Sequence, residues 1–340
     1  MAFEFSDEDA ASVCAACHAA GMGCLADRRV DRVKGRDTKF QVIQQRLLDC
    51  AFGDFVPGTD SDPAPGRLSR DYRTRATQNV LRSGQINFGP EFRASQQQLA
   101  KVDGDVYELM EAATLWNAAA VWNSYMDTGV WTSGSLTCPP DAIATPTRKV
   151  AIIKMARGAD TTKLLNPAAR AAYAAFEVAL SRDGMELKLS TPDILGVRIP
   201  DPTPPGYEQF LSPLPDLSRA SQEHLETAWQ RIQGTLEGRH FMFAIAVKTS
   251  TRSDRLYQAL FEANVLKFII GYVLRGPAIK FHAHLESFAG SDVVGRYKAA
   301  AMTSLLAGGT PSKAIDVVYP ALRPQETAQM VLNSLPGYPL

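Results

Sequence analysis

The longest regular pattern of apolar and polar residues in the chain lies between Val106 and Asn123. Apolar side chains recur there every three or four residues, which predicts a long helix with one broad apolar stripe. The stripe consists of Val106, Met110, Leu115, Ala118, Ala119 and Trp122. Residues 1–50 have Ala-rich and Gln-rich segments without strand alternation, so we expect a helical N-terminal region. Pro57 to Gly66 predicts a loop, and an irregular region is expected from there to about Leu99.

Beyond residue 146 the pattern changes to strands that alternate with helices. Strands are expected at Val150–Met155, Ile194–Ile199, Phe241–Val247 and Ile279–Leu285, and helices at Asn166–Ser181, Ser221–Leu236 and Ser253–Val273. The run Phe241–Val247 is almost continuously apolar, which is typical of a strand buried on both faces. The alternation predicts an α/β fold with a central mixed sheet flanked by helices, with the helical N-terminal region added to it.

The charge of the chain is balanced, with 36 Lys and Arg against 36 Asp and Glu among 340 residues. A net charge of zero argues against a protein that coats nucleic acid without specificity. Two local basic patches, at 27–46 and 67–93, remain available for phosphate contacts or for an ordinary solvated surface. No apolar run approaches the roughly 18–20 residues that cross a bilayer, and the N-terminus is acidic where a signal peptide is basic. We expect a cytoplasmic location, with which the five cysteines agree.

Three residues in the second half of the chain point to phosphodiester hydrolysis. Asp193 follows Thr191-Pro192 and opens a predicted strand, Lys248 ends the buried strand, and Glu262 lies fourteen residues further on the next predicted helix. Carboxylates can hold a divalent cation against a scissile phosphate oxygen, and a lysine can position the attacking water and offset the developing charge. Mg²⁺ is the natural cation for such a site. Each residue alone also fits a turn, a strand cap or a surface charge.

The fuller pattern resembles a known family. Asp193 and Lys248 resemble the PD-(D/E)xK nuclease superfamily, and the string from Lys248-Thr-Ser-Thr-Arg252 to Glu262-Ala-Asn-Val is similar to the CCGG-cutting restriction endonucleases of the NgoMIV and SgrAI family. Those enzymes lack the acid two residues before the lysine, here Ala246, and use a glutamate of the following helix, here Glu262. The alanine departs from NgoMIV and agrees with SgrAI. The resemblance implies a type II restriction endonuclease with a PD-(D/E)xK core.

A second segment, from Lys101-Val-Asp-Gly-Asp to Glu108, resembles the helix whose glutamate joins the metal site in SgrAI-like enzymes. The resemblance therefore implies catalytic residues Asp193, Lys248, Glu262 and Glu108, of which the three carboxylates bind Mg²⁺, with Mn²⁺ as a substitute. Cleavage before the first C of CCGG, with four-base 5′ overhangs, is implied in the same way.

The segment Arg252-Ser-Asp254-Arg255 has the chemistry of a base reader. Arginine donates to guanine O6 and N7, and aspartate accepts from cytosine N4, so one unit can read adjacent C·G pairs. Asp254 is also compatible with an ordinary helix start. A palindromic site requires at least a homodimer, and tetramers and larger assemblies occur in this family. Arg36 and Lys101 match positions that contact DNA outside the core, which predicts an extended site of about eight base pairs.

These features divide the expected protein into a DNA-contacting region, 1–95, and a catalytic core, 96–340. Cys14, Cys17, His18 and Cys24 also permit a zinc site, and the spacing of Cys14 to His18 matches haem attachment, but we favour an Ala-rich helix that uses the cysteines as small apolar residues. His282 and His284 are expected to be structural or surface residues. The competing functions are a site-specific DNA-binding protein without cleavage, another nuclease of the superfamily for repair or recombination, and a zinc- or haem-binding protein built around Cys14 to Cys24.

Overall fold

The computed structural model describes residues 23–31, 36–187, 191–249, 253–288, 293–302 and 311–338, with a few residues between 15 and 20. Its centre is a five-stranded sheet in the order β3-β4-β5-β6-β7. The strands are β3 (Val150–Lys154), β4 (Ile194–Arg198), β5 (Phe241–Lys248), β6 (Lys280–Leu285) and β7 (Val317–Pro320). β3, β4 and β5 pair antiparallel, whereas β5, β6 and β7 pair parallel, so the predicted mixed sheet is confirmed.

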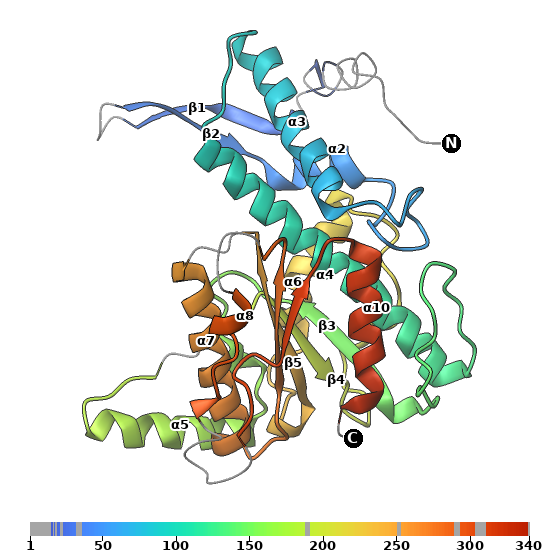
Figure 1. The fold of residues 1–340 in the computed structure, drawn as a ribbon, viewed down its shortest axis with the longest axis vertical. Coiled ribbons are helices and arrows are strands. Elements are labelled where there is room, and N and C mark those ends of the chain that lie inside the picture. The colour runs from blue at the N-terminus through green and yellow to red at the C-terminus, as the bar shows by residue number, and fades with distance from the viewer. Residues whose placement is uncertain are drawn as a thin grey trace.

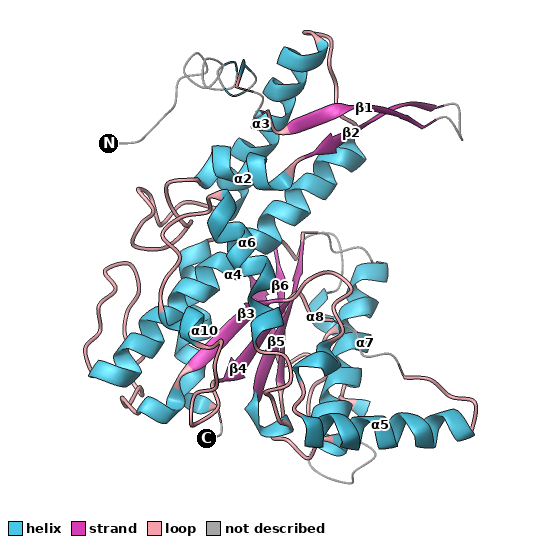
Figure 2. Ribbon diagram, turned by 180° about the vertical axis from the view of Figure 1, so that it is seen from behind, coloured by secondary structure: helices cyan, strands magenta, loops and turns pink. Residues whose placement is uncertain are grey.

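Helices cover both faces of this sheet (Figures 1 and 2). On one face lie α4 (Gln96–Thr128), α6 (Arg219–Arg231) and α10 (Pro324–Ser334), and on the other lie α5 (Pro167–Arg182), α7 (Ser253–Phe268) and α8 (Val293–Arg296). A π-helical turn, Ile269–Val273, continues α7. Short 3-10 helices span Pro146–Arg148, Thr161–Leu164, Glu208–Leu211, Gly238–His240 and Leu335–Gly337.

The sheet is held together by apolar packing that the sequence of its strands permits. Every residue of β3, and every residue of β5 except Lys248, is buried. Gly196 of β4 has no side chain because the ring of Phe243 on β5 fills that space, and a Cβ there would lie 2.2 Å from the ring. Burial of both faces explains why these strands read as continuous apolar runs.

The long helix α4 makes side-chain hydrogen bonds to segments that lie next to the sheet. It begins at a capping box formed by Ser95 and Gln98 and ends at Gly129, which adopts a left-handed conformation (φ 70°). The Asn117 side chain bonds the backbone of Leu214 in both directions, and the Asn123 side chain does the same with Val150. These buried amides fix the rotation of α4 against the sheet.

The N-terminal region differs from the prediction. It contains an antiparallel hairpin, β1 (Leu25–Asp31) and β2 (Arg36–Val42), where we expected only helix, followed by α2 (Gln44–Phe52). The segment expected to be irregular up to Leu99 contains the helix α3 (Ser69–Phe88). Figure 1 shows the hairpin extending outward beyond α3 and the start of α4. Residues of α2, α3 and the sheet belong to one continuous apolar core, and the division at residue 95 stays a prediction.

Candidate active site

Asp193 and Lys248 meet where the ends of two neighbouring strands adjoin. Asp193 immediately precedes β4, and Lys248 is the last residue of β5. One carboxylate oxygen of Asp193, Oδ2, accepts hydrogen bonds from Lys248 Nζ and from the Val247 backbone N–H, both at 2.7 Å. The Asp193 carbonyl also accepts from the Met155 backbone N–H at 3.0 Å. Because Asp193 and Lys248 lie at the ends of two hydrogen-bonded strands, the pairing of these strands sets the separation of the two side chains.

Glu108 of α4 lies beside this pair. Burial raises the pKa of the Glu108 carboxyl, and the negative charge of Asp193 raises it further, whereas the Lys154 ammonium acts in the opposite direction. Lys154 Nζ lies 3.0 Å from Glu108 Oε1. Lys154 ends β3 and pairs with Ile194, the residue after Asp193. Sequence reasoning predicted the strand but gave Lys154 no role, although a lysine that ends an apolar strand was the available signal.

Glu262 has a different environment. It lies on α7, as predicted, is only 5% exposed, and its Oε1 accepts a hydrogen bond from Gln258 Nε2 at 2.8 Å. Burial raises the pKa of Tyr297, and the nearby Glu262 carboxylate raises it further. Among the residues that the structure describes, no three His, Cys, Asp or Glu side chains lie close enough together to hold a metal ion. The structure therefore does not gather Asp193, Glu108 and Glu262 into one three-carboxylate cluster.

The pair formed by Asp193 and Glu108 nevertheless suits a hard divalent cation. The two carboxylates are near enough for the charge of one to raise the pKa of the other, and a cation between them relieves that repulsion. Asp193 Oδ1 accepts no hydrogen bond from the described part of the chain, because both bonds to its carboxylate go to Oδ2. Mg²⁺ commonly takes one or two carboxylates and keeps several waters, which matches this donor set.

The predicted DNA readers are only partly visible. Arg252 lies outside the described residues, and Asp254 and Arg255 are placed in the first turn of α7 by their backbone alone. Arg36 opens β2, and its side chain also lies outside the described part. The Lys101 side chain is 67% exposed and binds Asp105 Oδ2 at 2.5 Å, and Asp105 is also bound by Arg157 at 3.0 Å. Their contacts with bases stay predictions.

Two further expectations concern histidine and cysteine. His282 and His284 are buried in β6, and His284 Nδ1 pairs with the buried carboxylate of Glu111 on α4, so the structural alternative holds and the surface alternative is wrong. Cys14 and His18 of the possible zinc site lie outside the described residues, while Cys17 and Cys24 are free thiols. In the described ranges, the helices are too short or too polar to cross a membrane.

A mixed five-stranded sheet with an aspartate and a lysine meeting at adjoining strand ends is the framework of a restriction endonuclease. Residues 69–335 match the family model of the Cfr10I/Bse634I restriction endonucleases. The chain belongs to this family of type II restriction endonucleases and is thus a site-specific deoxyribonuclease. The family implies a divalent metal, typically Mg²⁺. The closer likeness to SgrAI stays a prediction.

Solved structures agree on the fold. The crystal structure of the type IIF restriction endonuclease Bse634I with cognate DNA has a TM-score of 0.70 and 18% identity, covering 91% of this chain and 96% of the other. A second structure of Bse634I has a TM-score of 0.69 and 17% identity, covering 92% and 97%. A comparison with curated proteins gives no match.

Proposed function

We propose that the chain hydrolyses both strands of an extended palindrome with a CCGG core, in a Mg²⁺-dependent reaction at the site formed by Asp193, Lys248 and Glu108. The observation that carries the proposal is the contact between Lys248 and Asp193 at paired strand ends, with Glu108 beside them. A protein that only binds DNA has no need for this arrangement of two carboxylates and two lysines. The arrangement is what a phosphate-cleaving site requires.

Asp193 and Glu108 are the proposed metal ligands, and Glu262 is proposed to join them only if its helix moves toward the site. When bound, Mg²⁺ would act as a Lewis acid on a scissile phosphate oxygen. Lys248 Nζ orients the attacking water and offsets the negative charge that grows on the phosphate. The water gives up a proton to solvent and its oxygen forms a bond to phosphorus as the bond to the 3′ oxygen breaks; the 3′ oxygen takes up a proton from solvent, which leaves a 5′-phosphate and a 3′-hydroxyl. The Lys154 ammonium opposes the effect of burial on the pKa of the Glu108 carboxyl.

Sequence recognition is proposed for Arg252, Asp254 and Arg255, which follow Lys248, the last residue of β5, within seven positions of the sequence. This short separation supports a position of the readers close to the chemistry. A palindrome read in this way calls for two copies of the chain related by a two-fold axis, so we propose a homodimer as the smallest active unit. We propose that Arg36 and Lys101 select the outer bases, that the site has about eight base pairs, and that cutting before the first C leaves four-base 5′ overhangs.

Digestion of a sequenced plasmid, with Mg²⁺, with Mn²⁺ and with chelator, followed by mapping of the ends, tests the proposal. We expect cuts only with metal and only at CCGG-core sites. The Lys248→Ala variant should keep site-specific binding and lose cleavage by several orders of magnitude, because binding depends on groove and phosphate contacts. A purified chain that binds its site and never cuts with either metal would instead support the DNA-binding alternative. Cuts without CCGG would support another nuclease.

The outer-base contacts need a separate experiment. Cleavage profiling on a library with randomised flanks should show a relaxed flanking preference for Arg36→Ala and for Lys101→Ala. If these residues bind only phosphate, both variants will weaken all sites alike and flatten the salt dependence. An unchanged flanking preference in both would contradict the proposed role.

A further inference from the structure

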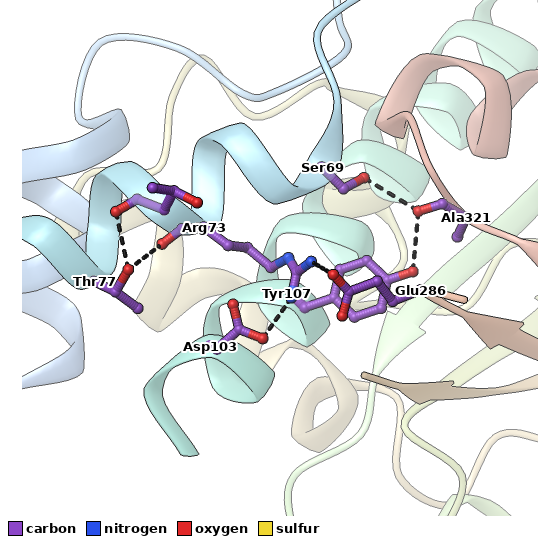
Figure 3. A network of polar contacts seen from close by, with 8 residues as sticks. Ser69, Arg73, Thr77, Asp103, Tyr107, Glu286 and Ala321 are labelled. Carbon is purple, nitrogen blue, oxygen red and sulfur yellow. Dashed lines mark hydrogen bonds and ion pairs between the residues drawn. The ribbon is translucent and has the colours of Figure 1, made fainter. Parts of the chain in front are cut away.

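Arg73 of α3 has a guanidinium group that is buried between three segments of the chain. The residue is 2% exposed, although it belongs to a stretch rich in arginine that we interpreted as a possible phosphate-binding patch. Its Nη1 binds Asp103 Oδ2 of α4 at 2.5 Å, and its Nη2 binds the carboxylate of Glu286, just beyond β6. Figure 3 shows the arginine side chain reaching from α3 to both carboxylates. Arg73 is thus an internal contact and unavailable to DNA phosphate.

Each partner of Arg73 adjoins a residue of the proposed active site. The Glu286 backbone N–H donates to the Lys248 carbonyl at 3.3 Å, so Glu286 is attached to the end of β5. The Arg73 guanidinium carbon lies 5.0 Å from the centre of the Tyr107 ring, and Tyr107 directly precedes Glu108. Asp103 lies one helical turn before Tyr107 on the same face of α4. One guanidinium therefore contacts the segment that carries Glu108 and the segment that holds Lys248.

A second set of bonds supports the same junction. Tyr107 Oη and Ser69 Oγ both donate to the Ala321 carbonyl, at 3.1 and 3.2 Å, and Ala321 directly follows β7 (Figure 3). The Ala321 backbone N–H in turn donates to the Leu285 carbonyl at the end of β6. Hydrogen bonds and ion pairs therefore connect the carboxyl ends of three parallel strands to α3 and α4 in one region of the molecule. A planar guanidinium with its donors in a fixed fork is suited to hold two carboxylates at a set separation.

We propose that Arg73 is a positioning residue for cleavage, which fixes Glu108 on α4 relative to Lys248 and Asp193 on the sheet. The inference rests on the proposed function of those three residues. Without the guanidinium, Asp103 and Glu286 repel each other, and α4 and the sheet lose the bridge that sets their distance. Of the two carboxylates proposed to bind Mg²⁺, Glu108 lies on α4 and Asp193 on the sheet. Loss of the bridge should therefore raise the Mg²⁺ concentration that cleavage requires. A purely structural ion pair would lower stability without changing that concentration.

The test compares Arg73→Met and Arg73→Lys with the matched variant Lys267→Met. Lys267 is also a cation in a largely buried ion pair, with Nζ at 2.6 Å from Asp316 Oδ2, but it lies at the amino ends of the parallel strands. For each full-length variant, the thermal unfolding midpoint, cognate-duplex binding without Mg²⁺ and the Mg²⁺ concentration for half-maximal single-turnover cleavage are measured. All three variants should unfold earlier. Only the Arg73 variants should need more Mg²⁺, by about 10-fold or more in Arg73→Met, as for lost supporting contacts around a metal.

Arg73→Lys keeps the charge but lacks the fork, so it should raise the Mg²⁺ requirement while remaining folded, and it carries the test if Arg73→Met fails to fold. A Mg²⁺ requirement within about twofold of wild type in the folded Arg73 variants, or an equal rise in Lys267→Met, would overturn the inference. Wild-type cleavage is measured first. Its absence would contradict the proposed function as a whole, whereas wild-type cleavage with unchanged Arg73 variants contradicts this inference alone.

Discussion

Replacement of Asp193 by asparagine has a matched control within the same sheet. Asp316 Oδ2 accepts from the Phe281 backbone N–H at 2.8 Å and from Lys267 Nζ at 2.6 Å, which repeats the contacts of Asp193 Oδ2 with Val247 and Lys248. The two carboxylates are similarly exposed, 21% for Asp193 and 15% for Asp316. The two ion pairs differ in position: Asp193 lies at the proposed metal site, whereas Asp316 precedes β7, away from that site.

The expected cost in stability is similar for both substitutions, because the one additional partner of Asp316, Lys280 with Nζ at 3.7 Å from Oδ1, is half exposed and contributes little. An asparagine keeps an oxygen for the backbone N–H and loses one charged hydrogen bond to a lysine, which is worth about 1.5–3 kcal/mol before screening. Because all four side chains are partly accessible to water, we expect a loss of about 1–2 kcal/mol in the free energy of unfolding. Catalysis should separate the two. A metal ligand stabilises the transition state by several kcal/mol, so Asp193→Asn should slow cleavage by about 1000-fold or more.

Urea denaturation measures the first effect, and single-turnover cleavage of a cognate duplex at high Mg²⁺ measures the second. Asp316→Asn should cleave within about threefold of wild type after losing as much stability as Asp193→Asn. A rate for Asp193→Asn within about tenfold of wild type would refute the assignment of the metal site. Equal loss of cleavage in both variants would show that damage to the sheet, and not loss of a ligand, is responsible.

Further substitutions have measurable expected outcomes. Arg255→Ala should lose about 1–3 kcal/mol of discrimination at the CCGG core, and equal weakening on specific and random DNA in a binding assay would indicate a phosphate contact. At fixed, limiting Mg²⁺ the cleavage rate should fall as the pH drops through the raised pKa of Glu108, since a protonated carboxyl holds no cation. Lys154→Met should move this decline to higher pH because the ammonium lowers that pKa, and coincident pH–rate profiles would contradict the arrangement. Gly104→Ala should add about 0.5–1 kcal/mol to the free energy of unfolding, since a Cβ there meets only Thr249 Oγ1 at 3.7 Å. Gly84→Ala should instead cost about 1–3 kcal/mol, because its Cβ would lie 2.1 Å from the Phe92 ring. Urea unfolding curves of the two variants that shift in the same direction would disprove this pair of expectations.

The parts of the fold that could be predicted are those with a strong periodic signal. The strand ending at Lys248 is predictable because its apolar run is continuous, and the helix carrying Glu262 is predictable because apolar residues recur along its length. The hairpin at 25–42 was missed because it is a two-stranded ribbon rich in charge, with few apolar positions to show a two-residue period. In α3 a signal existed, since Tyr72, Ala76 and Val80 recur every four residues and are buried, but the many arginines obscured it.

The candidate site was predictable only where a motif carried it. Asp193 and Lys248 were named from the sequence, and the structure places them in contact. Lys154 contacts Glu108 and Arg73 contacts Glu286, and both carboxylates lie far away in the sequence. No local pattern reveals such partners. Arg73 also shows that a run of arginines is ambiguous, because burial of one guanidinium depends on where Asp103 and Glu286 are brought by the fold.

The hydrogen bonds that Asn117 and Asn123 of α4 make with Leu214 and Val150 restrict how the length of this helix can change among relatives of this chain. One inserted residue between Glu108 and Asn117 would turn all that follows by about 100° and advance it by about 1.5 Å. Asn117 and Asn123 would then face away from Leu214 and Val150, and four buried hydrogen bonds would be lost together. We therefore expect relatives of this chain to keep the length between Glu108 and Asn123 constant and to vary there by substitution.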